Sequence, residues 1–138
     1  MKKLFVFLIF FNLLSVNLNA ATFNWTKFNI TEEGDTEWFY DEKTILKVGS
    51  YRFYWTLTNY LKNIQDNVYS VVGHHMVNCG TNESKWITYT SFNSPMGRGT
   101  VDMDVVIPAV APEKFKWDYF SPDETIYGGM LKEICSYR

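Results

Sequence analysis

The segment Tyr51–Tyr60 carries the pattern that most constrains the fold of this chain. Its odd-numbered positions from 51 to 57 are all aromatic or aliphatic, whereas its even-numbered positions include Arg52, Tyr54 and two threonines. A period of two residues, built from aromatic and β-branched side chains, is typical of a β-strand with one apolar face. We therefore expect a strand of ten residues here, extending about 33 Å.

Other segments of the chain also have the composition of strands and are bounded by turn residues. The six expected strands are Trp25–Ile30, Glu37–Asp41, Tyr51–Tyr60, Val68–Cys79, Lys85–Phe92 and Thr100–Ile107. The fourth is expected to bend or bulge at Gly73, because glycine inside a strand often marks a bulge. The segment Pro108–Pro112 holds two prolines and cannot belong to a central strand.

One helix is expected at the C-terminal end. Ser121 and Glu124 stand three residues apart around a proline, which is the pattern of a capping box with Ser121 as N-cap. Apolar residues then recur at helical spacing up to Cys135. Gly128 and Gly129 interrupt this helix, either by bending it or by letting it approach the sheet closely. Strands followed by one helix indicate an α+β domain, with an antiparallel sheet of about six strands covered on one face.

The first twenty residues have the three-part pattern of a secretory signal peptide. Two lysines precede the segment Leu4–Leu18, in which 12 of 15 residues are apolar, and small residues follow at Ala20 and Ala21. We expect cleavage after Ala20 and a single mature domain over residues 21–138. The alternative, an uncleaved anchor, fits less well because a spanning helix needs about 20 predominantly apolar residues.

Export restricts the location and the partners of the mature chain. Its net charge becomes −4, because the two lysines of the leader are removed and no acid is. Such a charge argues against nucleic-acid binding, which normally requires a basic face. No cysteine stands near the cleavage site to carry a lipid anchor, and no second long apolar run follows. We expect a periplasmic or extracellular protein without a transmembrane segment.

Cys79 and Cys135 are the two cysteines of the chain. In an oxidising compartment, an even count with none left over favours one disulfide bond. The pair would close a loop of 56 residues, for which chain entropy predicts a stabilisation of about 4 kcal/mol. A reactive thiol or a zinc site is the alternative, although no C-x-x-C motif occurs. The bond would clamp the helix to the end of a strand.

Aromatic, cysteine and turn residues follow one another in a distinctive order along the mature chain. In order they are Trp25, Phe39-Tyr40-Asp41, Phe53–Tyr60, Ser70, Cys79, Tyr89, Pro95–Gly99, Trp117, Pro122 and Cys135. This ordered set resembles the bacterial surface-adhesin protein E-like domain family, over about residues 25–135. The resemblance implies about six antiparallel strands with a C-terminal helix held by the disulfide. It also implies binding of host extracellular-matrix or plasma proteins.

Several side chains invite a catalytic or metal hypothesis. His74 and His75 are adjacent, so in a regular strand they point to opposite faces and cannot share one metal ion. Ser70 with a histidine and Asp41 would form a hydrolytic triad, but no nucleophile-elbow motif occurs. The acidic residues at positions 32, 33, 35 and 37 do not have the spacing of an EF-hand loop. We expect no catalytic site, no metal and no cofactor.

Aromatic residues make up 18% of the chain and are the better candidates for a binding surface. Tyr54 lies opposite the apolar face of its strand, and Trp86 lies opposite Ile87 and Tyr89 in a regular strand. If the helix covers the apolar face, these two residues belong to the uncovered face, where an aromatic patch marks a binding surface. The alternative is that residues 101–116 or a partner subunit cover this face as well.

The leading hypothesis is therefore an exported, non-enzymatic binding domain. It would recognise an extracellular-matrix protein, an envelope protein or another macromolecule through the sheet face opposite the helix, with Tyr54 and Trp86 as candidate binding residues. The second hypothesis is a periplasmic structural or accessory protein without a host ligand, motivated by the missing lipid anchor. An enzyme or small-ligand carrier, the third, would need a closed pocket with a titratable pair.

Overall fold

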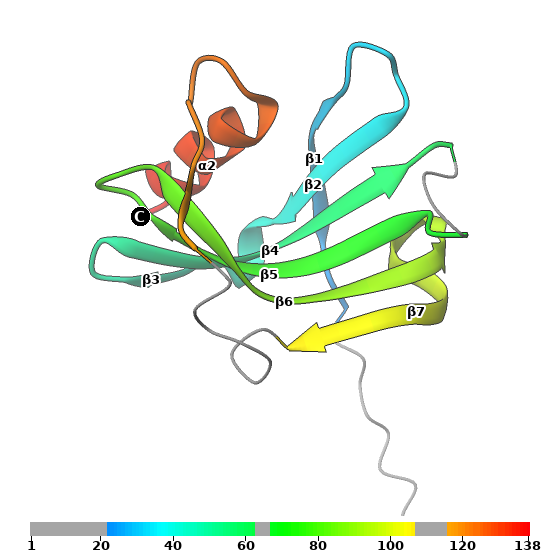
Figure 1. Ribbon diagram of the computed structural model, residues 1–138. Coiled ribbons are helices and arrows are strands. Elements are labelled where there is room, and N and C mark those ends of the chain that lie inside the picture. The colour runs from blue at the N-terminus through cyan, green and yellow to red at the C-terminus, as the bar shows by residue number, and fades with distance from the viewer. Residues whose placement is uncertain (1–21, 63–66, 107–115) are drawn as a thin grey trace, which may run out of the picture.

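The computed structural model describes residues 22–62, 67–106 and 116–138. Two expectations, the signal peptide over residues 1–20 and the irregular Pro108–Pro112 segment, lie outside the described residues. The rest of the chain forms one antiparallel sheet and a C-terminal helix (Figure 1). The structure therefore confirms the α+β class predicted from the sequence.

Within the described residues, six strands pair in the order β1-β2-β4-β5-β6-β7, and two short strands pair outside this path, β3 with β4 and β8 with β6. The elements are β1 (Trp25–Ile30), β2 (Thr36–Asp41), η1 (Glu42–Thr44), β3 (Leu46–Val48), β4 (Tyr51–Tyr60), β5 (Ser70–Asn78), β6 (Glu83–Ser94), η2 (Pro95–Gly97), β7 (Arg98–Val106), β8 (Asp118–Tyr119) and α2 (Ile126–Ser136). All six expected strands are present. Two of them, Trp25–Ile30 and Tyr51–Tyr60, have the predicted bounds, and the ends of the other four differ from the prediction.

Strand β4 lies near the middle of the sheet, and both of its faces are used. It pairs with β5 along nearly its whole length, with β3 at its start and with β2 over its second half. Its even-numbered face, which carries Tyr54, lies beneath α2, and its odd-numbered face, which carries Leu57, packs into a second apolar cluster. The helix therefore covers the face that the sequence pattern marks as the less apolar one.

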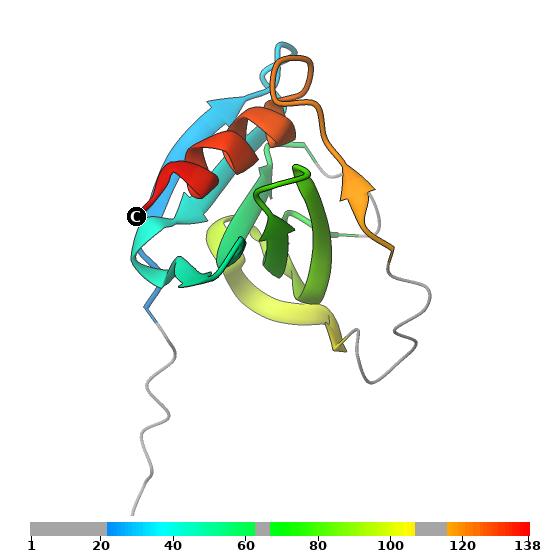
Figure 2. The ribbon, with the colours of Figure 1, turned by 90° about the vertical axis from the view of Figure 1, so that its left-hand side faces the viewer.

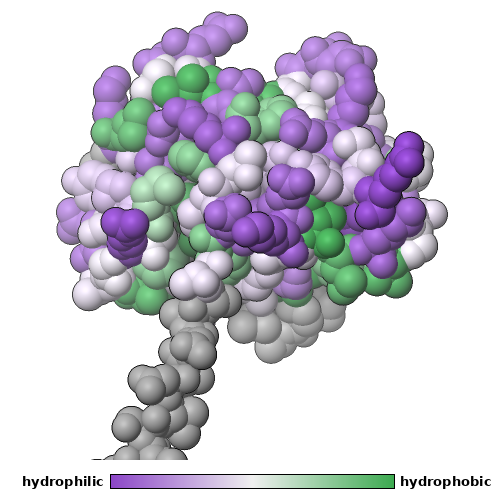
Figure 3. Space-filling view, turned by 180° about the vertical axis from the view of Figure 1, so that it is seen from behind, coloured by the Kyte–Doolittle hydropathy of each residue, from purple (hydrophilic) through white to green (hydrophobic). Residues whose placement is uncertain are grey.

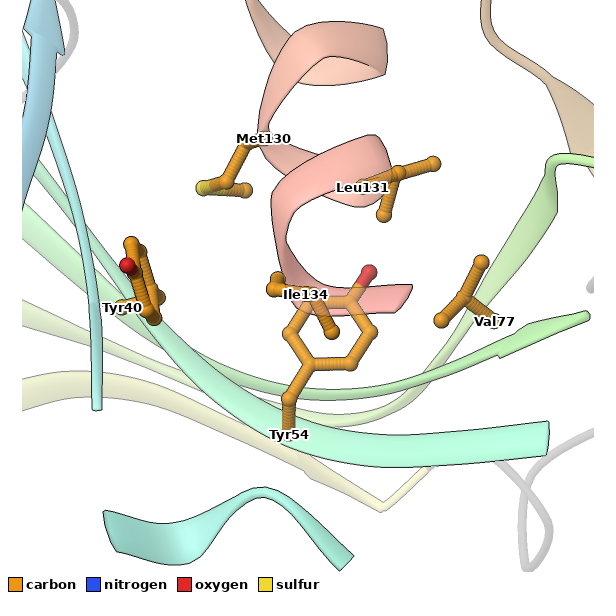
Figure 4. Close-up of a cluster of buried hydrophobic side chains, with 6 residues drawn as sticks. All are labelled: Tyr40, Tyr54, Val77, Met130, Leu131 and Ile134. Atoms are coloured by element: carbon orange, nitrogen blue, oxygen red, sulfur yellow. The ribbon is translucent and has the colours of Figure 1, made fainter. Parts of the chain in front are cut away.

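The main core fills the space between α2 and this even-numbered face (Figure 4). Its fully buried members are Tyr40, Tyr54, Val77, Met130, Leu131 and Ile134. The opposite face holds the second cluster, in which Phe39, Leu57 and Val72 are buried. Both tyrosines of the main core place their hydroxyl groups in hydrogen bonds, Tyr40 to Glu133 at 2.6 Å and Tyr54 to Ser84 at 2.8 Å. A tyrosine can therefore serve as a core residue here.

The disulfide bond joins Cys79, which follows β5, to Cys135 in the last turn of α2, with 5.6 Å between their Cα atoms. It confirms the predicted clamp between the end of a strand and the final helix. Both cysteines pack against the main core. Figure 2 shows the helix lying across the sheet with its C-terminal end beside η1. The bond thus fixes one end of the helix on the sheet.

The start of α2 differs from the sequence prediction. The N-cap is Thr125, four residues after Ser121; its hydroxyl oxygen accepts the N–H of Gly128 at 2.9 Å, and the helix begins at Ile126. Hydrogen bonds of the residue before Ser121 explain this later start. The backbone N–H of Phe120 donates to the carbonyl of Asn82 in the β5–β6 turn, and the side-chain amide of Asn82 donates to the carbonyl of Phe120. The carbonyl of Ser121 then accepts the N–H and the hydroxyl of Thr125. Ser121 therefore supports the cap and is not the cap itself.

The helix runs without interruption through Gly128 and Gly129. Gly128 lies against the carbonyl of Ser121, so close that an added Cβ would overlap it. At Gly129 the nearest atom to an added Cβ would be Cζ of Phe28, at an ordinary contact distance of 3.5 Å. A side chain at position 128 would therefore collide with the loop before the helix, whereas a methyl group at position 129 would fit.

This difference gives a paired test of the helix start. Gly128→Ala should lower the free energy of unfolding by about 2 kcal/mol, because overpacking forces the loop carbonyl away. Gly129→Ala should leave it unchanged or raise it by up to about 1 kcal/mol, through the better helix propensity of alanine. Urea unfolding of both variants measures the difference. Equal destabilisation by the two substitutions would contradict this account of the helix start.

Candidate functional site

The helix covers only part of its face of the sheet, and an open cleft lies beside its N-terminal half. We call it the aromatic cleft; its volume is about 230 Å³. Its lining residues are Trp38, His75, Ser84, Lys85, Trp86, Asp118, Phe120 and Tyr127. They come from β2, β5, β6, β8 and the start of α2, so the cleft exists only once the sheet and the helix are assembled.

Trp86 forms an exposed wall of the cleft, with 37% of its surface accessible. A register shift in the β5–β6 ladder pairs His74 with Thr88 and His75 with Trp86, which leaves Ile87 as an extra residue in β6. This bulge reverses the alternation, so that the rings of Trp86 and Tyr89 meet edge to face at 5.6 Å. The prediction that these two residues lie on opposite faces is therefore wrong.

Gly73 explains why Trp86 can lie flat against the sheet. An added Cβ at Gly73 would overlap the six-membered ring of Trp86 and crowd Nε2 of His75, at 2.7 Å. The sequence predicted a bulge at this glycine, whereas the extra residue lies on the neighbouring strand at Ile87. Glycine here serves the close approach of an aromatic ring to the backbone.

His75 forms the floor of the cleft and is 1% exposed. Its Nε2 lies 2.8 Å from the hydroxyl of Thr56, and its Nδ1 lies 3.1 Å from the hydroxyl of Tyr127. Its ring stacks on Tyr54 at 5.2 Å and contacts Trp86 at 4.0 Å. Burial, reinforced by the charge of His74, lowers the pKa of His75 to about 3. The imidazole is therefore neutral at physiological pH and acts as an aromatic spacer with two hydrogen bonds.

A chain of hydroxyl groups continues from His75 beneath the helix. The hydroxyl of Tyr127 lies 2.7 Å from that of Tyr54, which in turn lies 2.8 Å from Oγ of Ser84. Oγ of Ser84 donates to the carbonyl of Met76 at 3.2 Å. Burial raises the pKa of Tyr127 to about 12, so these groups stay protonated. The network fixes the ring of Tyr127 at the edge of the cleft.

The two residues predicted for a binding surface therefore have different positions. Tyr54 is 0% exposed and lies under α2 (Figure 4). The expectation that it occupies an uncovered face is wrong, because the helix packs on the even-numbered side of β4 and not on the odd-numbered side. Trp86 lies on the same side of the sheet but beyond the helix, where it is accessible. Of the two, Trp86 is the one that a partner can contact.

The residues considered for a metal site or a hydrolytic triad do not lie together in the described part of the structure. His74 and His75 point to opposite faces, as expected, and His74 stacks on Trp55 at 4.5 Å. Among the residues that the structure describes, no group of three or more His, Cys, Asp or Glu side chains could hold a metal ion. Ser70 donates to the carbonyl of Ser94, at 2.7 Å, and has no histidine partner among the hydrogen bonds of the described chain.

The acidic residues near the first turn have structural partners. Asp35 accepts the hydroxyl of Thr31 at 2.7 Å, and Glu37 pairs with Lys27 at 2.6 Å. Asp41, the third member of the imagined triad, accepts the N–H groups of Asn24 and Lys43. These carboxylates are thus used to fix the β1–β2 turn and the start of η1.

Sequence reasoning missed Trp38, Phe120 and Tyr127. Trp38 lies opposite Thr58 in the β2–β4 ladder and so shares the helix-covered side of the sheet. Its indole N–H is buried and has no acceptor among the described residues. Phe120 and Tyr127 meet edge to face, with 4.5 Å between their ring centroids, although they are seven positions apart in the sequence. The alternation of residues in β2 was enough to predict which face of the sheet Trp38 occupies. The positions of Phe120 and Tyr127 depend instead on the loop before α2.

A second hollow, of about 390 Å³, lies on the opposite face of the sheet. Phe23 and Trp25 stack there at 4.7 Å, and Phe23 also contacts Trp55 at 5.2 Å. Seen from behind, the described part of the surface mixes hydrophilic and hydrophobic side chains without separating them into large areas (Figure 3). Helices of the described part of the chain are too short or too polar to cross a membrane.

The described residues form a small α+β domain, tied by one disulfide bond, with an aromatic cleft beside the helix. The chain matches the sequence model of surface-adhesin protein E over residues 25–136, and it belongs to that family. The family is one of surface adhesins and not of enzymes. This confirms the family resemblance seen in the order of landmark residues.

Solved structures support the same fold. A crystal structure of Haemophilus influenzae protein E, in crystal form II, superposes with a TM-score of 0.52 at 16% identity, covering 80% of this chain and 87% of that one. A structure of protein E from non-typeable Haemophilus influenzae gives a TM-score of 0.51 at 14% identity, covering 80% and 75%. No curated protein sequence matches the chain significantly. At these identities the likeness shows the fold alone.

The buried neutral imidazole predicts how stability depends on pH. The unfolded chain takes up a proton on His75 near pH 6.5, whereas the folded chain does so only near pH 3. The free energy of unfolding should therefore fall as the pH drops from 6.5 toward 3, by up to about 1.4 kcal/mol per unit. Urea unfolding of His75→Gln should show a weaker pH dependence, while His74→Gln retains most of it. An unchanged slope in His75→Gln would contradict the assignment.

Proposed function

We propose that this protein is an exported, adhesin-like domain that binds a protein or other macromolecule through the aromatic cleft. The observation that carries the proposal is the accessible ring of Trp86, 37% exposed, at the wall of a cleft whose other aromatic rings, Trp38, Phe120 and Tyr127, are half-buried. Tryptophan and tyrosine are enriched among the residues that dominate binding energy at protein interfaces. Membership of a surface-adhesin family supports the same class of function.

The cleft is suited to binding because its rings are already fixed. The bulge at Ile87 and the absence of a side chain at Gly73 hold Trp86 in place, and the hydroxyl network holds Tyr127. Binding to such a surface loses little side-chain entropy, since the rotamers are set before the partner arrives. Lys85 and Asp118 add charged groups around the rings, which matches the polar rim of ordinary interfaces.

The cleft replaces the face opposite the helix as the proposed binding surface. We keep Trp86 as the binding residue and assign Tyr54 the supporting role of holding Tyr127 and His75. An extracellular-matrix, plasma or envelope protein is the partner class that the family supports. The chemistry of the cleft favours a partner that presents an apolar or aromatic side chain to it.

A single substitution tests this surface. Trp86→Ala should weaken capture of the partner about 30-fold or more, as expected for loss of an interface anchor worth about 2 kcal/mol. The matched control is Tyr119→Ala, because Tyr119 is a large aromatic residue, 64% exposed, on the neighbouring strand β8 but outside the cleft lining. The measurement is binding to a panel of immobilised extracellular-matrix and plasma proteins.

Far-ultraviolet and near-ultraviolet circular dichroism of both variants establish that the fold is intact. Capture that is unchanged in Trp86→Ala, or equally weakened in Tyr119→Ala, would argue against the aromatic cleft. A loss confined to Trp86→Ala supports it. Because Tyr54 is buried, its substitution would test folding and is not used.

The location of the mature domain decides whether it can meet a partner outside the cell. We propose that residues 1–20 direct export and that the mature domain reaches the cell surface, while a periplasmic accessory protein is the alternative. Protease shaving of intact cells should remove an exposed domain and should spare a known periplasmic protein probed in parallel. Complete survival of the domain, followed by digestion after permeabilisation, would favour the periplasmic role.

A further inference from the structure

A buried arginine without an acidic partner lies at the opposite end of α2 from the aromatic cleft. Arg52, in β4, is 6% exposed. Its Nη1 donates to the carbonyls of Gly49 and Tyr51 at 3.3 and 3.1 Å, and its Nη2 donates to the carbonyl of Tyr137 at 3.2 Å. Its Nε–H is buried and has no acceptor among the described residues. Every group that Arg52 contacts through these bonds is neutral.

A buried charge normally has a partner of opposite charge. The described residues form ion pairs between Lys27 and Glu37 and between Lys132 and Asp123, and neither involves Arg52. The carbonyl of Tyr137 follows the C-terminal end of α2, where a cation is favourable. This contact explains how Arg52 ties the helix end to the sheet, but it leaves the positive charge uncompensated.

The residue directly across from Arg52 adds to this charge. In the β3–β4 ladder the cross-strand partner of Arg52 is Lys47. Like charges directly opposite each other destabilise a pair of strands. No acid of the described chain intervenes as an ion-pair partner of either residue. An anion bound between Arg52 and Lys47 would remove the repulsion between their positive charges.

Arg52 and Lys47 line a cleft of about 310 Å³, which we call the basic cleft. Its other charged lining residues are Lys43, Arg138 and Glu42. Four cationic side chains thus face one acidic side chain, although the whole chain carries a net charge of −2. The nearby carboxylate of Asp41 is used by the N–H groups of Asn24 at 2.9 Å and Lys43 at 3.0 Å. The local excess of positive charge is therefore a feature of this site and not of the surface as a whole.

We propose that the basic cleft binds a phosphate or sulfate ester group of a ligand. The exposed guanidinium of Arg138 presents a planar fork of N–H donors that matches two oxygens of such a group, and Lys43 and Lys47 add point charges around it. The three side chains at the rim, Lys43, Lys47 and Arg138, are exposed and can approach an incoming anion. Arg52 forms the buried wall and supplies charge from below. The site is separate from the aromatic cleft and does not depend on the proposed function.

The test uses the mature, disulfide-bonded protein labelled with ¹⁵N. Inorganic phosphate, inorganic sulfate and a heparin-derived sulfated tetrasaccharide are titrated at constant ionic strength. We expect saturable shifts of the backbone amide signals of Lys43, Lys47 and Arg138. Tighter binding of the tetrasaccharide than of inorganic sulfate supports a sulfated glycan as the source, and tighter binding of inorganic phosphate than of sulfate supports a phosphate group.

Pairs of variants with the same change in charge distinguish binding at the basic cleft from general attraction of anions to a positively charged surface. Lys43→Gln/Lys47→Gln should raise the dissociation constant about tenfold or more, through loss of charge-assisted contacts. Lys62→Gln/Lys132→Gln removes the same charge from exposed lysines outside the cleft and should change it less than about twofold. Arg138→Lys keeps the charge but loses the fork of an exposed guanidinium, and should weaken binding while near-ultraviolet circular dichroism confirms the fold. Shifts that do not saturate for any probe, or equal weakening in the two double variants, would overturn the proposal.

Discussion

The packing of α2 on the even-numbered face of β4 is the contact on which the rest of the structure depends. It buries Tyr54 among Met130, Leu131 and Ile134, and the Cys79–Cys135 bond holds its C-terminal end. At its start, the helix places Tyr127 beside the sheet and so completes the aromatic cleft. At its end, it brings the carbonyl of Tyr137 to Arg52 in the basic cleft. Both clefts therefore result from one helix–sheet interface.

Local departures from regular structure decide what each cleft presents. One extra residue in β6, Ile87, sets Trp86 on the side of the sheet that the helix occupies. A glycine on the neighbouring strand, Gly73, leaves the space into which the indole ring fits. Burial beneath it lowers the pKa of His75 and raises that of Tyr127, so that His75 stays neutral and Tyr127 stays protonated. The result is a rigid aromatic surface whose charge does not change near neutral pH.

Much of the fold was predictable because its signals are local. Alternation in Tyr51–Tyr60 identifies a strand, and the two cysteines identify a clamp once export is inferred. The helix start was misplaced because Ser121 and Thr125 are both good caps, and hydrogen bonds between Phe120 and Asn82 decide between them. The candidate site was only partly predictable. Trp86 was predicted as a candidate binding residue on the face opposite the helix, whereas it lies on the face that the helix partly covers.

The sequence by itself determined the element types, their order, the pairing of the cysteines and the family. These follow from periodicity, composition and the order of landmark residues, which do not require knowledge of long-range contacts. Only the tertiary structure decided which face of the sheet the helix covers. The strand pattern favoured the odd-numbered side of β4, yet the helix lies on the even-numbered side. The hydroxyl groups of Tyr40 and Tyr54 on that side form hydrogen bonds with Glu133, Ser84 and Tyr127. A face with polar residues in its sequence pattern can therefore be buried.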